Sequence, residues 1–358
     1  MKVKKERTEK LRGLMAQEGL DALLVVKPAS IMYLTGASIY PFERMWVYIV
    51  RKNGNDVLLA NKLFVFPDTG IATKWHTDND DAPAVLCAEL GGIRKLGVEK
   101  DITAKYILPI MKNYPEMEVV CSECVDDLRR VKEPEELQKM IESSLINDAV
   151  SEEVFTKLHE GMTEKELADL VSEGYAARGA EGPCFETIAA FGANAADPHH
   201  SSDDTRLKKG DCVLVDMGCY KHGYCSDMTR TEFFGSATEE NEKVYNTVLA
   251  AQEAAMAIIK PGVRFCDIDK AARDVITEAG YGEYFTHRLG HCIGLQEHEP
   301  GDVGPVNTKT VEPGMVFSIE PGIYLTGKFG VRIENLVYVT EDGYRSLNHR
   351  SREFRIDK

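Results

Sequence analysis

The stretch LVDMGCYKHGYCSDMTRT, residues 214–231, places two aspartates in apolar surroundings. Asp216 follows three aliphatic residues, and Asp227 comes after a turn-forming run, Lys221 to Gly223. We interpret the stretch as a β-hairpin, because two strand-like runs are joined by a short turn that contains glycine. A turn centred between the first two residues of that run sets Asp216 directly opposite Asp227, with Cβ atoms about 5 Å apart. Buried carboxylates at that separation repel each other, so the hairpin needs shared protons, an ion pair or cations.

A second hairpin with the same property is predicted nearer the C-terminus. The runs MVFSIEPGIYL (315–325) and FGVRIENLVYV (329–339) flank a turn centred on Gly327, and this register sets Glu320 opposite Glu334. A single acid in a strand is usually solvated, but four acids in two matched pairs favour bound cations. Structural ion pairing with nearby arginines, Arg230 and Arg332, is the simpler alternative.

The chemistry of these donors indicates which cations to expect. Carboxylate oxygens without thiolates favour Mn²⁺, Mg²⁺ or Co²⁺ over a structural zinc site. Two acid pairs suggest two metal ions, which together polarise a carbonyl and supply a hydroxide nucleophile. The predicted hairpins therefore indicate a hydrolytic centre.

Composition limits the class of protein. With 358 residues and 43% apolar content, the chain is long enough for two domains, and its formal charge of −15 argues against nucleic-acid or anionic-membrane partners. The N-terminus lacks the apolar core of a signal peptide and no run is long enough to span a bilayer, so we expect a cytoplasmic protein. The nine cysteines are scattered, as expected of reduced thiols.

The order of predicted elements indicates two domains of different kinds. Strand-like runs and helices alternate up to about residue 125, and a long amphipathic helix follows the segment VKEP, so we place domains at 1–127 and 128–358. A weak internal repeat about a hundred residues apart follows Gly161 and Gly262. A capping box of Thr163 and Glu166 opens the first copy, and Asp267 is expected to cap the second. The repeat indicates either two similar halves or a coincidence of helix starts.

Histidines gather in two motifs, PHHS at 198–201 and HRLGHCIGLQEHEP at 287–300. Single histidines are more often packed or solvated than functional. Three within twelve positions, at His287, His291 and His298, favour a site.

The order PHH, VDMG with YCSD, HRLGHCIGLQEHEP, SIEPGIY and GVRIEN resembles the proline-specific peptidases of the pita-bread metallopeptidase family, peptidase family M24, which includes prolidase (Xaa-Pro dipeptidase) and aminopeptidase P. The resemblance is detailed over residues 131–345. It implies an α+β fold: a catalytic domain of the pita-bread (creatinase/aminopeptidase) type with pseudo-twofold halves, preceded by a smaller α/β domain of the creatinase/prolidase N-terminal type.

The resemblance also implies a role for each matching residue. It assigns five ligands to two divalent metal ions, most simply Mn²⁺ with Co²⁺ or Zn²⁺ as alternatives: Asp216, Asp227, His291, Glu320 and Glu334. Catalysis is assigned to His199, His298 and Glu320, the last as general base, and substrate binding to His287 and Arg332. Of the adjacent pair after proline the family pattern selects His199, which leaves His200 without assigned chemistry. The resemblance further implies a homodimer that acts on proline-containing dipeptides or short peptides.

Several alternatives remain at this stage. We favour a dipeptidase, with Xaa-Pro aminopeptidase as the runner-up, and no residue distinguishes them. A metal-free enzyme of the creatinase type or a non-catalytic binding module is disfavoured, because all five ligand positions hold metal-binding residues. Cys292 departs from the family pattern and is expected to bring a soft sulfur close to the centre, and the altered HEPGDVG loop makes the substrate pocket harder to predict.

Overall fold

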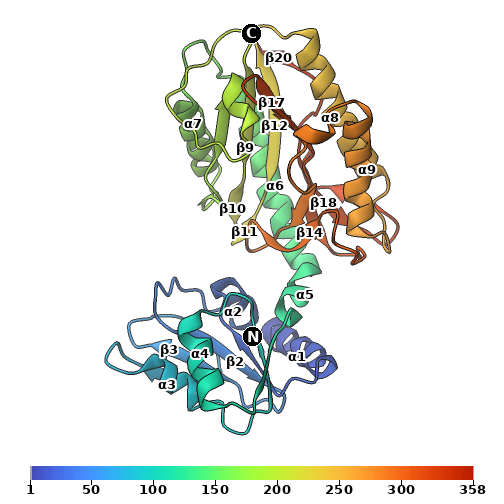
Figure 1. Cartoon of the computed structure of the whole chain (residues 1–358). Helices are drawn as coiled ribbons and strands as arrows, with labels where there is room; N and C mark the ends of the chain where they lie inside the picture. The colour runs from blue at the N-terminus through green and yellow to red at the C-terminus, as the bar shows by residue number, and fades with distance from the viewer. Residues whose placement is uncertain (1, 358) are drawn as a thin grey trace. The chain divides into compact units, whose positions relative to one another are not determined.

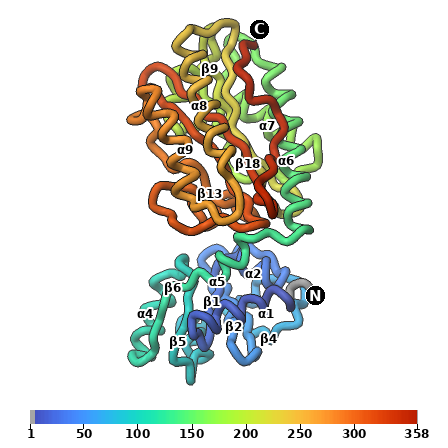
Figure 2. Tube along the Cα trace, turned by 90° about the vertical axis from the view of Figure 1, so that its right-hand side faces the viewer, coloured from blue at the N-terminus to red at the C-terminus, as the bar shows by residue number. Residues whose placement is uncertain are grey.

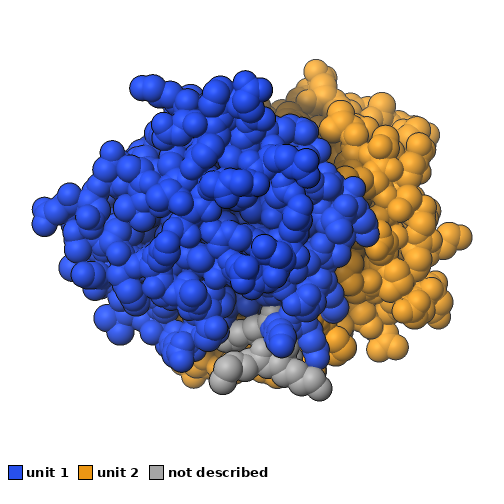
Figure 3. Space-filling view, turned by 90° about the horizontal axis from the view of Figure 1, so that it is seen from below, with its two compact units in different colours: residues 1–129 blue, residues 130–358 orange. Residues whose placement is uncertain are grey.

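The structure, a computed structural model, describes residues 2–357, with side chains from residue 5 onward. The chain forms two compact units, residues 1–129 and 130–358, which Figure 3 colours separately. The predicted domain boundary, between residues 127 and 128, differs by two residues from this division between residues 129 and 130.

The first unit is a six-stranded mixed sheet with helices, in the strand order β4-β3-β2-β1-β5-β6 (Figure 1). Helices α3 and α4 share a core with alternate residues of the central strands, among them Leu24, Ile49 and Leu96. The elements are α1 (Lys2–Gln17), β1 (Ala22–Val25), α2 (Pro28–Thr35), β2 (Trp46–Arg51), β3 (Val57–Asn61), β4 (Ala72–His76), α3 (Ala82–Cys87), β5 (Lys95–Val98), α4 (Ala104–Asn113), β6 (Glu118–Cys121) and α5 (Cys124–Arg130).

The second unit packs two helix pairs, α6 with α7 and α8 with α9, against sheets that are antiparallel except where β12 pairs with β20 (Figures 1 and 2). Its first half contains α6 (Pro134–Phe155), α7 (Glu164–Ala177), β7 (Gly182–Pro183), β8 (Ile188–Phe191), η1 (Gly192–Ala196), β9 (Cys212–Met217), β10 (Cys219–Lys221), β11 (Tyr224–Cys225) and β12 (Met228–Phe234). Its second half contains α8 (Glu239–Ala257), α9 (Phe265–Glu278), η2 (Gly282–Tyr284), β13 (Gly290–Cys292), β14 (Glu299–Val303), β15 (Val316–Ile319), β16 (Gly322–Leu325), β17 (Phe329–Arg332), β18 (Asn335–Val339), β19 (Tyr344–Ser346) and β20 (Ile356–Asp357).

Strand β9 is apolar along its length because it serves two cores. Cys212 and Leu214 join the core under α8 and α9, whereas Val213, Val215 and Met217 join the core under α6 and α7. Successive side chains of a strand point to opposite faces, so a strand between two helix layers needs apolar residues at both. Asp216, which shares a face with Cys212 and Leu214, is the exception to this pattern and is only partly buried.

The internal repeat corresponds to matching backbone geometry. Gly161 and Gly262 both have positive φ, +85° and +87°, and each donates its amide to a carbonyl before the next hairpin, Leu207 or Val311. The capping box of Thr163 at the start of α7 is present as predicted. Together these features agree with the two-halved pita-bread architecture.

The predicted cap of the second copy was wrong. The N-cap of α9 is Arg264, and Asp267 lies within the first turn, where its carboxylate accepts two hydrogen bonds from the Arg264 guanidinium. An acid in the first turn still complements the helix dipole.

The predicted register of the first hairpin was also wrong. The turn is centred between His222 and Gly223, both with positive φ (54° and 74°), as a two-residue primed turn requires. Asp216 therefore opposes Thr229 rather than Asp227. Moving the turn centre by one residue moves the pairing by two, so both aspartates keep the same face.

The register of the second hairpin was predicted correctly. Ile319 pairs with Asn335 and Gly322 pairs with Arg332, and this sets Glu320 opposite Glu334 between the two strand pairs. Within residues 2–357, none of the helices combines the length and apolar character needed to cross a bilayer.

Candidate metal centre

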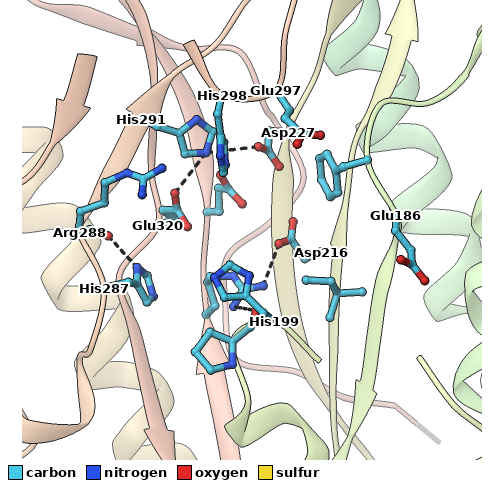
Figure 4. A pocket seen from close by; sticks show the side chains of 15 residues that line it. Glu186, His199, Asp216, Asp227, His287, Arg288, His291, Glu297, His298 and Glu320 are labelled. Atoms are coloured by element: carbon cyan, nitrogen blue, oxygen red, sulfur yellow. Dashed lines mark hydrogen bonds and ion pairs between the residues drawn. The ribbon is translucent and has the colours of Figure 1, made fainter. Parts of the chain in front are cut away.

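A cavity of about 250 Å³ opens between the two hairpins and the histidine loop of the second unit (Figure 4). Every residue that the sequence assigned to catalysis, substrate or metal lines it. The lining residues are Phe185, Glu186, Ile188, Pro198, His199, Asp216, Asp227, His287, Arg288, His291, Glu297, His298, Glu320, Arg332 and Glu334.

Three of the five predicted ligands form a tight group, which we call the cavity cluster: Asp227, His291 and Glu334. One donor atom from each lies within 4.8 Å of the other two, and all three residues are buried. Glu320 adjoins this group, with its Oε1 atom 3.4 Å from Nε2 of His291. Asp216 lines the same cavity and is 2.8 Å from the guanidinium of Arg332.

The local sequence explains how His291 reaches this place. It lies on β13, which pairs with β15. Its backbone amide donates to the Ser318 hydroxyl at 3.0 Å, and this hydrogen bond fixes the backbone at His291. Gly290 permits this approach, since a Cβ there would lie 2.0 Å from the carbonyl oxygen of Ser318. The neighbouring Cys292 points into the core under α8 and α9 and does not line the cavity. The expectation of a soft sulfur at the centre was therefore wrong, because adjacent strand residues face opposite sides.

The pKa values of the cavity cluster are shifted in the direction expected of acids that are buried without a compensating positive charge. Burial, followed by repulsion from neighbouring carboxylates, raises the pKa of Asp227 and of Glu334 well above the ordinary range. Burial likewise raises the pKa of Glu320 to about 7, although Arg332 opposes this shift. The pKa of His291 falls well below its usual value, mainly through burial, so the imidazole is neutral.

Three carboxylate oxygens of the site are buried without a hydrogen-bond partner among the described residues: Oδ1 of Asp216, Oδ1 of Asp227 and Oε1 of Glu334. Buried acceptors in proteins are almost always paired, so these oxygens require a ligand that the protein does not itself supply. Oxygen atoms with a neutral imidazole are donors that divalent cations accept. The residues present therefore fit a divalent metal centre.

One oxygen each of Asp216, Glu320 and Glu334 is held by a specific donor. Arg332 reaches Asp216 through Nη2 and the Thr229 hydroxyl through Nε at 3.0 Å, and Thr229 donates in turn to Glu334 at 2.8 Å. Ser318 donates to Oε1 of Glu320 at 3.0 Å. Arg230, by contrast, is buried and donates to backbone carbonyls, so it supports the hairpin and neutralises none of these acids.

The outer histidines surround the acids. Nδ1 of His287 lies 2.6 Å from the Arg288 carbonyl and so carries the proton, which leaves Nε2 to accept from the Tyr324 hydroxyl at 2.8 Å. Burial, then the charge of Arg332, lowers the pKa of His287 to about 4. The ring of His298 contacts that of His291, with centroids 4.0 Å apart, and burial lowers its pKa also. His199 lines the cavity from the segment between η1 and β9.

Sequence reasoning missed several residues of the site. Tyr324, which accepts from Arg332 at 2.9 Å, was inside the SIEPGIY motif but received no role. Arg288 and Glu297 also line the cavity, and each directly adjoins a histidine that was assigned. Phe185 and Glu186 come from a segment outside every motif, so no sequence signal pointed to them.

Comparisons with known proteins agree with this geometry. The family described as "Metallopeptidase family M24" matches residues 138–341, and the "Creatinase/Prolidase N-terminal domain" matches residues 7–131. A protein described as an uncharacterized peptidase of Staphylococcus aureus is 38% identical over 341 residues, which are 92% of this chain and 95% of that protein.

Two solved structures are similar over nearly their whole length. Dipeptidase PepE from Mycobacterium ulcerans is 34% identical with a TM-score of 0.93, and the alignment covers 99% of this chain and 98% of that one. A recombinant prolidase from Thermococcus sibiricus is 32% identical with a TM-score of 0.91, covering 98% of each chain.

Proposed function

The chain belongs to metallopeptidase family M24 and is a hydrolase, and from this premise we propose that it cleaves the peptide bond that precedes proline in dipeptides. The observation that carries the proposal is the convergence of four acids and one histidine on a cavity in which three carboxylate oxygens are unpaired. The dipeptidase and prolidase that this chain resembles support the substrate class.

We propose that two divalent ions, Mn²⁺ in the first instance, are held by Asp216, Asp227, His291, Glu320 and Glu334. When bound, such a pair lowers the pKa of water and polarises the scissile carbonyl. The unpaired oxygens of three of these acids support this ligand set.

The protein's own groups then have separable roles. Glu320 takes up the proton of the attacking water at Oε2, because Oε1 already accepts from Ser318. His199 and His298 act on the charge that develops at the carbonyl oxygen and at the proline nitrogen. His287 and Arg332 bind substrate, with the hydroxyl of Tyr324 holding the two side chains in one hydrogen-bonded row.

A small substrate fits the size of the cavity. Its volume of about 250 Å³ lies below the range of about 300–1,000 Å³ typical of pockets for drug-sized ligands. Xaa-Pro aminopeptidase activity on longer peptides remains the second candidate.

The proposal is tested by removing metal with a chelator, adding back Mn²⁺, Co²⁺ or Zn²⁺, and assaying Ala-Pro and Ala-Pro-Ala. We expect metal-restored release of proline from the dipeptide. Preference for the tripeptide would replace the dipeptidase with an aminopeptidase. Metal binding without cleavage of either peptide would refute proline specificity, and absence of metal binding would refute the centre itself. Light scattering tests the proposed homodimer.

A further inference from the structure

The second histidine of the PHH motif makes a partly buried contact with a fully buried acid outside the cavity. Nε2 of His200 lies 2.7 Å from Oε2 of Glu164, the first residue of α7, whose side chain has no solvent exposure. The same oxygen accepts from the amide of Asp203 at 3.0 Å. The other oxygen, Oε1, accepts from the amide of Phe191 at 2.8 Å and from Nδ2 of Asn194 at 2.9 Å.

The Glu164 carboxylate is therefore fully engaged. An ionised carboxylate offers about four acceptor positions, and four donors point at this one. We call Glu164, His200 and Asp203 the helix cluster, since donor atoms of all three lie within 4.8 Å of one another. Both oxygens of the buried Glu164 carboxylate are already hydrogen-bonded. The short distances within the helix cluster therefore reflect hydrogen bonds between α7 and the segment around His200, and no cation is needed to explain them.

The helix cluster holds the segment 197–203, which enters the cavity. Within this segment, the Pro198 carbonyl accepts from Nη1 of Arg332 at 3.4 Å, and His199 lines the cavity. The amide of His199 donates to the side chain of Asp197 at 3.0 Å, which tightens the turn before it. Ser202 fastens the far end to β8 by donating to the carbonyl of Ala189 at 3.1 Å.

The position of the His199 ring depends on this backbone. In the part of the chain that the structure describes, the ring has no hydrogen-bond partner, and the residue is exposed. The side chain of the neighbouring His200, by contrast, is fixed by its hydrogen bond to Glu164. A displacement of the segment therefore carries the His199 ring with it.

We propose that Glu164 and His200 are positioning residues that hold His199 at the cavity and the Pro198 carbonyl against Arg332. A displacement of about 1 Å in a catalytic group can lower the rate by about 10²-fold, so a distant clamp has a large effect on kcat. This inference rests on the proposed function only for the role of His199; the clamp itself stands on the contacts.

The test compares metal-loaded His200→Ala and His200→Gln with wild type on Ala-Pro. The amide nitrogen of glutamine occupies a place similar to that of Nε2, so His200→Gln keeps a donor for Glu164, whereas alanine removes it. We expect His200→Ala to lower kcat about 10- to 100-fold at unchanged metal content, and His200→Gln to restore most of the loss. His222→Ala is the matched control, because His222 also pairs with a glutamate but on an exposed turn, and it should leave kcat unchanged.

A double variant separates positioning from general damage. In a His199→Ala background, His200→Ala should cause a much smaller further loss in kcat, because the ring that it positions is already gone and only the contact of the Pro198 carbonyl with Arg332 can still be disturbed. An equal loss in both backgrounds, or wild-type kcat in His200→Ala, would overturn the proposal.

Hydrogen–deuterium exchange of the segment 197–203 distinguishes failure of the clamp from failure of the proposed function. We expect faster exchange in His200→Ala and near-normal exchange in His200→Gln, whether or not Ala-Pro is cleaved. Unchanged exchange in His200→Ala refutes the clamp. Faster exchange together with a His199→Ala variant of wild-type activity refutes the catalytic role of His199 and, with it, the functional half of this proposal.

Discussion

Two clusters in the second unit each bring two carboxylates and one imidazole within 4.8 Å: the cavity cluster of Asp227, His291 and Glu334, and the helix cluster of Glu164, His200 and Asp203. The first contains buried oxygens with no partner and acids whose pKa is raised well above the ordinary range. In the second, a buried acid receives four hydrogen bonds, two of them from backbone amides. Donor spacing alone therefore does not identify a metal site; the number of donors that already satisfy each oxygen does.

The largest expected effect comes from an acid-to-amide change in the cavity cluster. Glu334→Gln keeps the shape and the Thr229 hydrogen bond but removes a charged ligand oxygen. We expect bound metal per chain to fall and kcat/KM on Ala-Pro to drop by at least about 10²-fold, since losing even an outer partner of a metal ligand costs about 10- to 100-fold. Metal analysis with steady-state kinetics checks this, and a variant with full metal and full activity would remove Glu334 from the ligand set.

The same change should have opposite effects on the stability of the metal-free protein at the two clusters. Glu164→Gln replaces one carboxylate oxygen by an NH₂ group that faces hydrogen-bond donors. It should lower the free energy of unfolding by about 1–3 kcal/mol. Glu334→Gln should instead raise the free energy of unfolding of the metal-free protein. Folding raises the pKa of Glu334, so above pH 4.5 the folded chain must take up a proton or bury a charge, and glutamine does neither.

The pH dependence gives the sign of this second effect. Wild-type stability should fall as pH rises above the ordinary carboxyl pKa, and the gain from Glu334→Gln should grow over that range and vanish at lower pH. Urea unfolding of chelator-treated protein at several pH values measures both variants. Equal destabilisation by the two substitutions would contradict the contrast between the clusters.

A backbone change tests how closely the cavity cluster depends on strand packing. Gly290→Ala places a Cβ 2.0 Å from the Ser318 carbonyl oxygen, so β13 must move away from β15 and take His291 with it. We expect a loss of about 1–3 kcal/mol and weaker metal binding. Gly13→Ala, in α1 with open space around it, is the control and should be neutral or slightly stabilising.

The smallest effect is expected at the exposed member of the helix cluster. Asp203 contributes its backbone amide to Glu164, and its side chain accepts from the amide of Thr205, which an asparagine oxygen can also do. Asp203→Asn should leave the thermal midpoint within about 2 °C of wild type and leave kcat unchanged. A large loss of metal or activity in this variant would mean that the helix cluster is itself a metal site.

Much of the site followed from periodicity and turns. Alternation placed Asp216 and Asp227 on one face even though the turn centre was displaced by one residue, because pairing shifts in steps of two. The displaced turn was hard to predict, since His222 adopts positive φ, a conformation that only a few per cent of non-glycine residues adopt. Phe185 and Glu186 line the cavity from a segment whose composition shows nothing of the folded path.

The sequence by itself determined the family and the identity of the acids and histidines, because these depend on residue type and on the order of short motifs along the chain, and the two-halved fold followed from the family resemblance. Only the tertiary structure decided which oxygens remain unpaired, that Cys292 turns into the core, and that His200 binds Glu164. The physical reason is that a buried polar group is satisfied by partners far away in the chain, and no local pattern records where those partners arrive.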